Sequence, residues 1–267
     1  MNPIVRTLFV AWQEPESRRI FPIARLTRRR SGEYEFAYIE AVRAAQAQGF
    51  VGLPGLEDIE RVHVSAELPA LFEHRSASRG RPRSSGSSGG STTEPAGLSG
   101  EALDAAPITI FVRRAPGAAP ERLEAFSAPL RGPEGRRWGV FDARGVGRAP
   151  GSAELLQSLQ PHEPVTLRAE PHNQYNPHAL GIVRADQSEL GYVPDYLANE
   201  LARAGARPEQ LLVEVLGSQR LTFPPAAPVY RVTCRYSCSA ELGRLLFASE
   251  SYRPVAARAQ PSSNSAV

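Results

Sequence analysis

The chain has 267 residues, with 31 positively and 28 negatively charged side chains and a formal net charge of +3 at pH 7. It contains no lysine, so all of these positive charges are arginines, and its many alanine, glycine and proline residues suggest a GC-rich bacterial genome. Without lysine there is no phosphate-binding loop of the Gly-Lys-Ser/Thr type, which excludes an ATPase of that class. The small net charge permits a nucleic-acid partner without requiring one.

The length allows one large domain or two small ones. No long apolar span occurs, and residues 1–10 lack both the basic flank and the apolar length of a signal peptide. We therefore expect a cytoplasmic protein with no membrane partner.

Residues 1–75 are expected to form a small module of the α+β class. The apolar runs at 8–12 and 20–26 predict two strands, and the alternation over 34–38 is typical of a half-buried strand. An alanine-rich stretch at 40–49 ends on a glycine and predicts a helix. We expect a small antiparallel sheet with helices, which docks a protein partner.

Two segments have the composition of unstructured chain. Residues 76–105 are rich in glycine, serine and arginine, and they cannot bury enough apolar surface to offset the entropy of ordering. They predict a flexible linker. Residues 253–267 consist mostly of alanine, arginine, proline and serine, and we expect a disordered tail.

Residues 106–252 are expected to form the second domain, with its core at 136–237. Residues 107–112 predict a strand, and residues 121–126 predict an extended segment that braces this domain. The remaining elements expected are strands and helices at 138–141, 152–159, 165–169, 179–184, 194–204, 211–216 and 229–236.

A polar loop rich in turn-forming residues runs directly into an apolar strand of this domain. The run Glu-Pro-His-Asn-Gln-Tyr-Asn-Pro-His-Ala-Leu begins at Glu170, and Leu-Gly-Tyr-Val-Pro begins at Leu190. The loop offers amide, imidazole and phenol groups but no carboxylate between Pro171 and Pro177. Such groups on a rigid turn favour binding over covalent chemistry.

These two runs, with the helix after them, resemble the HIRAN domain, whose usual pattern is Glu-Pro-x-Asn-x-Tyr-Asp-x-Asn-Ala-Ile, a strand, Ile-Gly-Tyr-Val-Pro and a helix. The similar region extends from near Trp138 to near Tyr236. The resemblance implies a small β-barrel related to the OB-folds, with one or two helices. In fork-remodelling helicases this barrel captures the 3′ end of single-stranded DNA, so the resemblance implies a role in DNA repair or at replication forks.

The resemblance also implies the site residues. Tyr175 would be the platform on which a base stacks, and Asn173 would hold the terminal nucleotide. His178 lies where the family usually has Asn, and Tyr192 is expected to pack beneath the loop; both are further candidates for contact with nucleic acid.

The chain differs from the family at two places. End-binding members have Arg followed by aromatic residues on the first barrel strand, whereas this chain has Arg144 and Arg148 around Gly-Val-Gly. Either arginine is a candidate for phosphate contact. The Asp of the loop motif is Asn176 here, which removes a negative charge.

No pattern indicates an enzyme, a cofactor or a metal. His172, His178 and Asp186 lack a recognisable metal-ligand spacing, and two cysteines cannot complete a zinc site. Cys234 and Cys238 would lie about 13 Å apart along a strand, too far for a disulfide. Two functions therefore stay open: a non-catalytic protein that binds single-stranded DNA or DNA ends, and an adaptor whose loop binds a peptide.

Overall fold

The structure is a computed structural model that describes residues 7–69, 71–72, 107–112, 121–147, 152–221 and 229–256. The chain divides into two compact units. The first takes its described residues from 7–72, 110–112, 121–123 and 250–256, and the second from 107–109 and 124–249. The first unit is therefore discontinuous in sequence.

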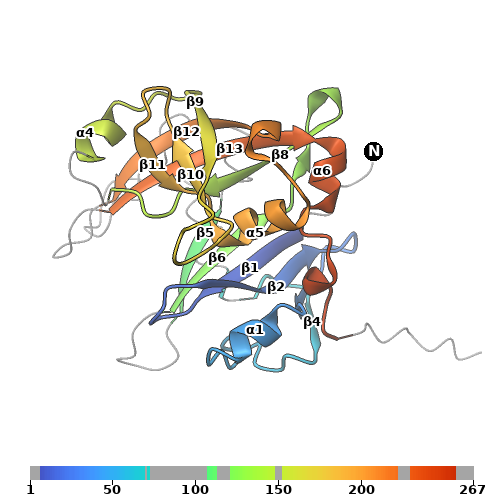
Figure 1. Cartoon of the computed structure of the whole chain (residues 1–267). Coiled ribbons are helices and arrows are strands. Elements are labelled where there is room, and N and C mark those ends of the chain that lie inside the picture. Colours follow the sequence, from blue (N-terminus) through green and yellow to red (C-terminus); the bar gives the residue numbers. More distant parts are fainter. Residues whose placement is uncertain are drawn as a thin grey trace, which may run out of the picture. The chain divides into compact units, whose positions relative to one another are not determined.

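The first unit contains a six-stranded antiparallel sheet in the order β4-β3-β2-β1-β6-β5 (Figure 1). Its strands are β1 (Thr7–Gln13), β2 (Ile20–Arg28), β3 (Tyr34–Tyr38), β4 (Val62–Ser65), β5 (Ile108–Val112) and β6 (Glu121–Ser127). The three expected strands at 8–12, 20–26 and 34–38 correspond to β1, β2 and β3. Strand β6 starts in this unit and continues into the second from Glu124.

Helix α1 (Val42–Gln46) follows β3 and is shorter than the alanine-rich stretch suggested. Gly49, with φ +89°, provides the left-handed turn that ends it. The chain then places Phe50 against the rings of Trp12 and Tyr38, with centroids 5.3 and 6.1 Å away. These aromatic contacts form the core on that face of the sheet.

The chain returns to the first unit at its C-terminal end. The ring of Tyr252, in the 3-10 turn η4 (Glu250–Tyr252), lies edge-on to Phe9, with centroids 5.1 Å apart. The Glu40 amide donates to the Arg253 carbonyl, and the Val255 amide donates to the Tyr38 carbonyl, both at 2.9 Å. The expected disorder is therefore wrong for residues 253–256, because they pair with the free backbone after β3. Residues 257–267 lie outside the described part.

The segment 121–126 was expected to brace the second domain, and from Glu124 onward β6 does belong to the second unit. Strand β6 also pairs beside β1, with β5 next to it, in the sheet of the first unit. The expected linker at 76–105 lies outside the described residues, so its character stays a prediction.

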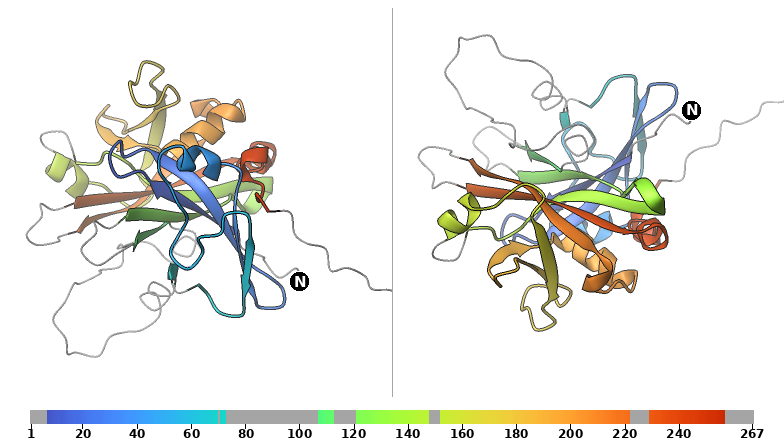
Figure 2. Two further views of the ribbon diagram at one scale, coloured as in Figure 1. Left: turned by 90° about the horizontal axis from the view of Figure 1, so that it is seen from below. Right: turned by 90° about the horizontal axis from the view of Figure 1, so that it is seen from above.

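The second unit contains a seven-stranded antiparallel sheet in the order β11-β10-β9-β12-β13-β8-β7 (Figure 2). Its strands are β7 (Leu130–Arg131), β8 (Arg136–Asp142), β9 (Pro164–Ala169), β10 (Leu180–Val183), β11 (Glu189–Tyr192), β12 (Leu212–Leu221) and β13 (Val229–Ser239). Its helical segments are η2 (Pro133–Gly135), α4 (Ser152–Gln157), α5 (Asp195–Arg203), η3 (Pro208–Gln210) and α6 (Ala240–Leu245).

The expected closed barrel is not observed among the described strands. The chain after β8 meets β11 at a single bridge, where Arg144 and Tyr192 exchange two backbone hydrogen bonds of 2.8 Å. Gly191 allows this approach, because a Cβ there would overlap the Arg144 carbonyl oxygen. The pairing stops after one bridge because Gly145 and Gly147 have φ of +68° and +79° and turn the chain away from an extended course.

The interior of this unit is mostly apolar, with a few buried polar residues. Cys234 and Cys238 are buried free thiols on β13. Helix α5 begins after Pro194, within the range expected for a helix, and buries Leu197 and Leu201. The helix thereby forms a fixed base beside the loop that precedes β10.

Candidate nucleic-acid interface

The loop between β9 and β10 is closed at its base by backbone hydrogen bonds. The Glu170 amide donates to the Ala179 carbonyl at 2.9 Å, and the Ala179 amide donates to the Asn176 carbonyl at 3.0 Å. Inside the loop, the Asn173 amide donates to the Glu170 carbonyl at 3.0 Å. The loop is thus a set of linked turns with a defined shape.

The side chain of Asn173 holds these turns together. Its Oδ1 accepts from the amides of Tyr175 and Asn176 at 3.0 and 3.3 Å, and its Nδ2 donates to Glu170 Oε2 at 3.3 Å. The acceptor expected to hold a nucleotide is therefore used within the loop. The second hydrogen on Nδ2 is the part of this amide left for a ligand.

Asn176 ties the loop to α5. Its side chain is buried, its Nδ2 donates to Asp195 Oδ1 at 2.9 Å, and its Oδ1 accepts from the His178 amide at 2.9 Å. The family's Asp at this place would have no N–H to offer to Asp195. The carboxamide at 176 therefore fits its neighbour on the helix.

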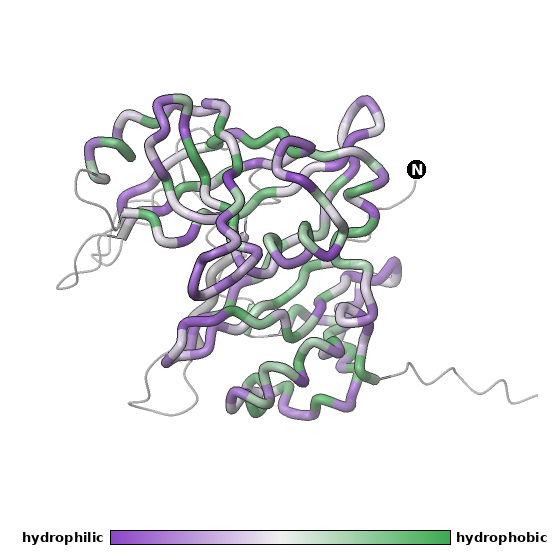
Figure 3. The backbone as a smooth tube through the Cα atoms, viewed as in Figure 1, coloured by the Kyte–Doolittle hydropathy of each residue, from purple (hydrophilic) through white to green (hydrophobic). Residues whose placement is uncertain are grey.

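Tyr175 is the most exposed large hydrophobic residue of the described chain, with 80% of its surface accessible. Its amide is fixed by Asn173, while its ring extends away from the unit. The loop as a whole is hydrophilic in Figure 3 and lies beside α5 in Figure 1. An aromatic ring on a polar, braced loop is thus available for stacking.

The other two loop candidates differ in position. His178 is exposed, and its backbone follows Asn176. Tyr192 is half-buried on β11, where burial and the neighbouring Glu189 and Glu170 carboxylates raise the pKa of its phenol to about 12. Its phenol is therefore neutral at physiological pH, and the expected packing beneath the loop stays a prediction.

Arg144 does not lie in an open groove. Its guanidinium forms an ion pair with Glu124, and the Tyr196 hydroxyl donates to the other Glu124 oxygen at 2.7 Å. Burial opposes the charge, but the Glu124 carboxylate outweighs it and raises the pKa of Arg144. A buried carboxylate already neutralises this arginine, which argues against the expected phosphate contact; that contact stays a prediction. Arg148 lies outside the described residues.

The surroundings of the loop are acidic. Residues 152–211 contain four arginines and eight carboxylates, a formal charge of −4. Arg168 pairs with Glu170 and Glu189, and Arg184 pairs with Glu163. No basic groove therefore accompanies Tyr175 within this stretch.

Glu124 and Phe126 are structural residues that no motif pointed to, and they pack against Tyr196 on α5, the helix that follows the Leu-Gly-Tyr-Val-Pro run. The rings of Phe126 and Tyr196 stack with centroids 3.9 Å apart, and Phe247 lies against Phe126 at 5.3 Å. The Phe247 amide donates to the buried Glu200 at 2.8 Å. Strand β6 and the chain after α6 are therefore part of the support for α5 and, through it, for the loop.

The second unit is a small, mainly antiparallel α+β domain with a braced, ring-bearing loop at the start of a buried strand. Residues 138–241 match the HIRAN domain family, so the chain carries a HIRAN domain in its C-terminal part. This family is generally associated with DNA binding. No curated protein and no solved structure matched the chain.

Among the described residues, no group of three or more His, Cys, Asp or Glu side chains is arranged to hold a metal ion. None of the helices in this part of the chain is long and apolar enough to cross a membrane.

Proposed function

We propose that the HIRAN domain binds nucleic acid without catalysis, with single-stranded DNA or a DNA end as its ligand, in DNA repair or at replication forks. The observation that carries this proposal is the exposed ring of Tyr175 on a loop fixed by Asn173 and Asn176. A base that stacks on such a ring gains about 1–3 kcal/mol. Because the loop is already ordered, little of this gain is spent in fixing it.

Only a few groups of the loop are left that could recognise a 3′ end of DNA. Arg144 is neutralised and Asn176 is bonded to Asp195, so the remaining candidates are Asn173 Nδ2, His178 and the loop backbone. We expect a free 3′ hydroxyl to be bound several-fold more tightly than a 3′-phosphorylated end. Equal affinity for the two ends would remove end recognition and leave single-strand binding.

Replacement of Tyr175 tests the proposed function. Tyr175→Ala should weaken binding of a fluorescent single-stranded oligonucleotide by about 5- to 150-fold, the equivalent of 1–3 kcal/mol. Tyr175→Phe keeps the ring and should bind like the wild type. Equal affinity of the Ala variant and the wild type, with an unchanged thermal midpoint, would exclude the loop as the stacking site.

The acidic surroundings of the loop favour a second candidate. Glu170 and Glu189 lie close to the loop base, and such carboxylates attract a basic peptide and repel phosphate. In this alternative the protein is an adaptor, with its first unit docking another protein. The adaptor would be established in place of DNA binding if an arginine-rich peptide binds the wild type, binds Tyr175→Ala more weakly and is not displaced by any oligonucleotide.

A further inference from the structure

The arginines of the second unit fall into two groups. Six of its twelve described arginines form ion pairs with carboxylates: Arg144, Arg168, Arg184, Arg203, Arg231 and Arg235. In contrast, Arg131, Arg136 and Arg137 on the β7–β8 hairpin have no carboxylate within ion-pair distance in the described part of the chain. Their charge is therefore not neutralised locally.

Neutral acceptors hold two of these side chains in place. Arg136 donates from Nε to Ser237 Oγ at 2.8 Å and from a terminal nitrogen to the Ser237 carbonyl at 3.1 Å. Arg137 donates to the Pro129 carbonyl at 3.0 Å. Hydrogen bonds to hydroxyl and carbonyl oxygens fix a guanidinium without cancelling its charge, so these groups are ordered and still cationic.

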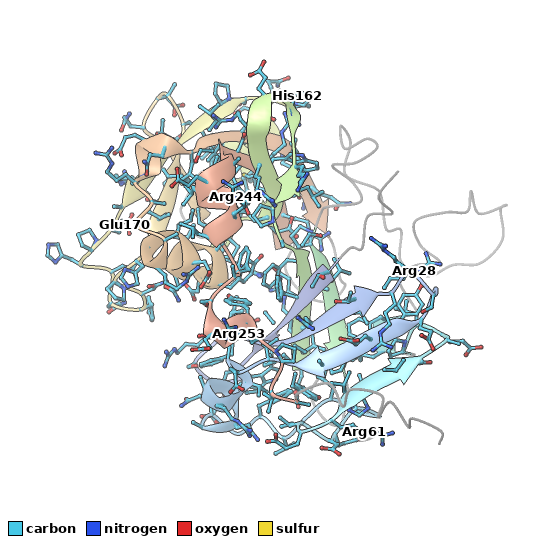
Figure 4. The ribbon with its side chains drawn as sticks, turned by 90° about the vertical axis from the view of Figure 1, so that its right-hand side faces the viewer. Arg28, Arg61, His162, Glu170, Arg244 and Arg253 are labelled. Atoms are coloured by element: carbon cyan, nitrogen blue, oxygen red, sulfur yellow. The ribbon has the colours of Figure 1, made fainter. Side chains whose placement is uncertain are left out.

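Arg131 lies directly opposite Arg137 in the register of the hairpin. Like charges at opposed positions destabilise a strand pair, and a bound anion relieves that repulsion. Helix α6 adds Arg244, which is exposed and is labelled in Figure 4. The preceding Gly243 lies so close to the stem of Arg137 that a Cβ there would be 2.6 Å from it.

Formal charge is unevenly distributed between regions of the second unit. Residues 130–147 and 229–249 contain seven arginines and three carboxylates, a formal charge of +4, whereas residues 152–211 carry −4. A polyanion is attracted to the first of these regions and repelled by the second.

We propose that Arg131, Arg137 and Arg244, the hairpin arginine surface, bind the phosphodiester backbone of a nucleic-acid strand. Arg131 and Arg137 share one face of the hairpin, and Arg244 follows the Gly243 that lies against Arg137. This rests on the proposed function and adds to it, because it places the phosphate contacts away from the Tyr175 loop. A guanidinium presents forked N–H donors that match phosphate oxygens. The hairpin arginines precede the segment that matches the family.

A salt titration separates this surface from the loop. The probe is a 5′-fluorescein-labelled DNA strand of about 20 nucleotides, longer than the site of one OB-type fold, and binding is followed by anisotropy. For a single strand, the slope of log K against log salt falls in magnitude by about 0.7 for each phosphate that an arginine no longer neutralises. The variant Arg131→Gln/Arg244→Gln should therefore lower it by about 1.4. The matched control, Arg43→Gln/Arg253→Gln, removes two exposed arginines that already have carboxylate partners and should leave the slope unchanged.

The outcomes distinguish the two proposals. An unchanged slope in the hairpin variant, together with weaker binding by Tyr175→Ala, overturns the hairpin arginine surface and leaves the proposed function standing. A reduced slope with no effect of Tyr175→Ala supports the surface and overturns the loop. No binding by the wild type at low salt overturns both. Binding of polyaspartate as tight as that of DNA assigns the surface to an acidic protein and overturns a nucleic-acid role.

Discussion

The buried ion pair between Glu124 and Arg144 provides the sharpest test of how the loop is supported. Glu124 is 2% exposed and accepts hydrogen bonds from both Arg144 and the Tyr196 hydroxyl. Glu124→Gln keeps the size of the side chain and one oxygen for Tyr196. It removes the charge opposite the arginine.

The expected loss of stability follows from the burial of Arg144. Only 19% of its side chain is exposed, and its Nε has no hydrogen-bond partner. A buried charge left without its partner lowers the free energy of unfolding by about 3–5 kcal/mol. Breaking an exposed pair costs about 0–1 kcal/mol, so Glu250→Gln, which breaks the pair with Arg253, is the matched control.

Urea unfolding followed by tryptophan fluorescence measures both variants, since Trp138 lies in the second unit with Glu124 and Trp12 lies in the first unit with Glu250. We expect Glu124→Gln to shift the midpoint far more than Glu250→Gln does. The double variant Glu124→Gln/Arg144→Met should recover most of the loss because it removes the stranded charge. A loss below about 1 kcal/mol for Glu124→Gln would show that water reaches Arg144 and would refute the reasoning.

Three further substitutions test other parts of the second unit. Burial is the main cause of the raised pKa of Asp142, so its ionised form is disfavoured in the fold; relative to Asp142→Asn, the wild type should have its full stability advantage below about pH 4 and should lose it progressively as the pH rises above that, measured by urea unfolding at each pH. Gly191→Ala should destabilise by more than Gly205→Ala in thermal unfolding, because both have positive φ but only the first has a carbonyl oxygen in the way of its Cβ. Asn176→Asp should weaken DNA binding and loop order by setting two carboxylates side by side, and Asp195→Asn in the same chain should restore both; no recovery would contradict the hydrogen bond between these two side chains.

Local sequence signals predicted local structure well. The segment 34–38, in which apolar and polar residues alternate, forms strand β3 with Phe36 and Tyr38 buried. Gly49 ends α1 at a position that requires a left-handed backbone conformation. The order of loop, strand, turn and helix from Glu170 onward is confirmed by β10, β11 and α5. These features depend on residues that are close together in the sequence, so the sequence alone is enough to predict them.

Long-range pairing was predicted poorly. The sequence at 107–126 indicates extended chain but does not specify which sheet receives it; β5 and β6 pair in the sheet that contains β1, while β6 from Glu124 onward belongs to the second unit. The pairing of Val255 with Tyr38 is equally invisible in a segment whose composition suggests disorder. Arg144 resembled a surface cation because its partner, Glu124, lies on another strand and in no motif.

The charge distribution bears on which part of a nucleic-acid strand the loop can accept. A nucleotide inside a strand has a phosphate on each side, whereas a 3′-terminal nucleotide has only one. The stretch that carries Tyr175 has a formal charge of −4, and repulsion between charges is felt over about 8 Å at physiological salt. Each phosphate brought close to the loop therefore opposes the gain from stacking. If the loop stacks a base as proposed, a terminal base would meet less of that opposition, so the same ring in the same acidic surroundings would favour a strand end over an internal site even without a dedicated contact to the 3′ hydroxyl.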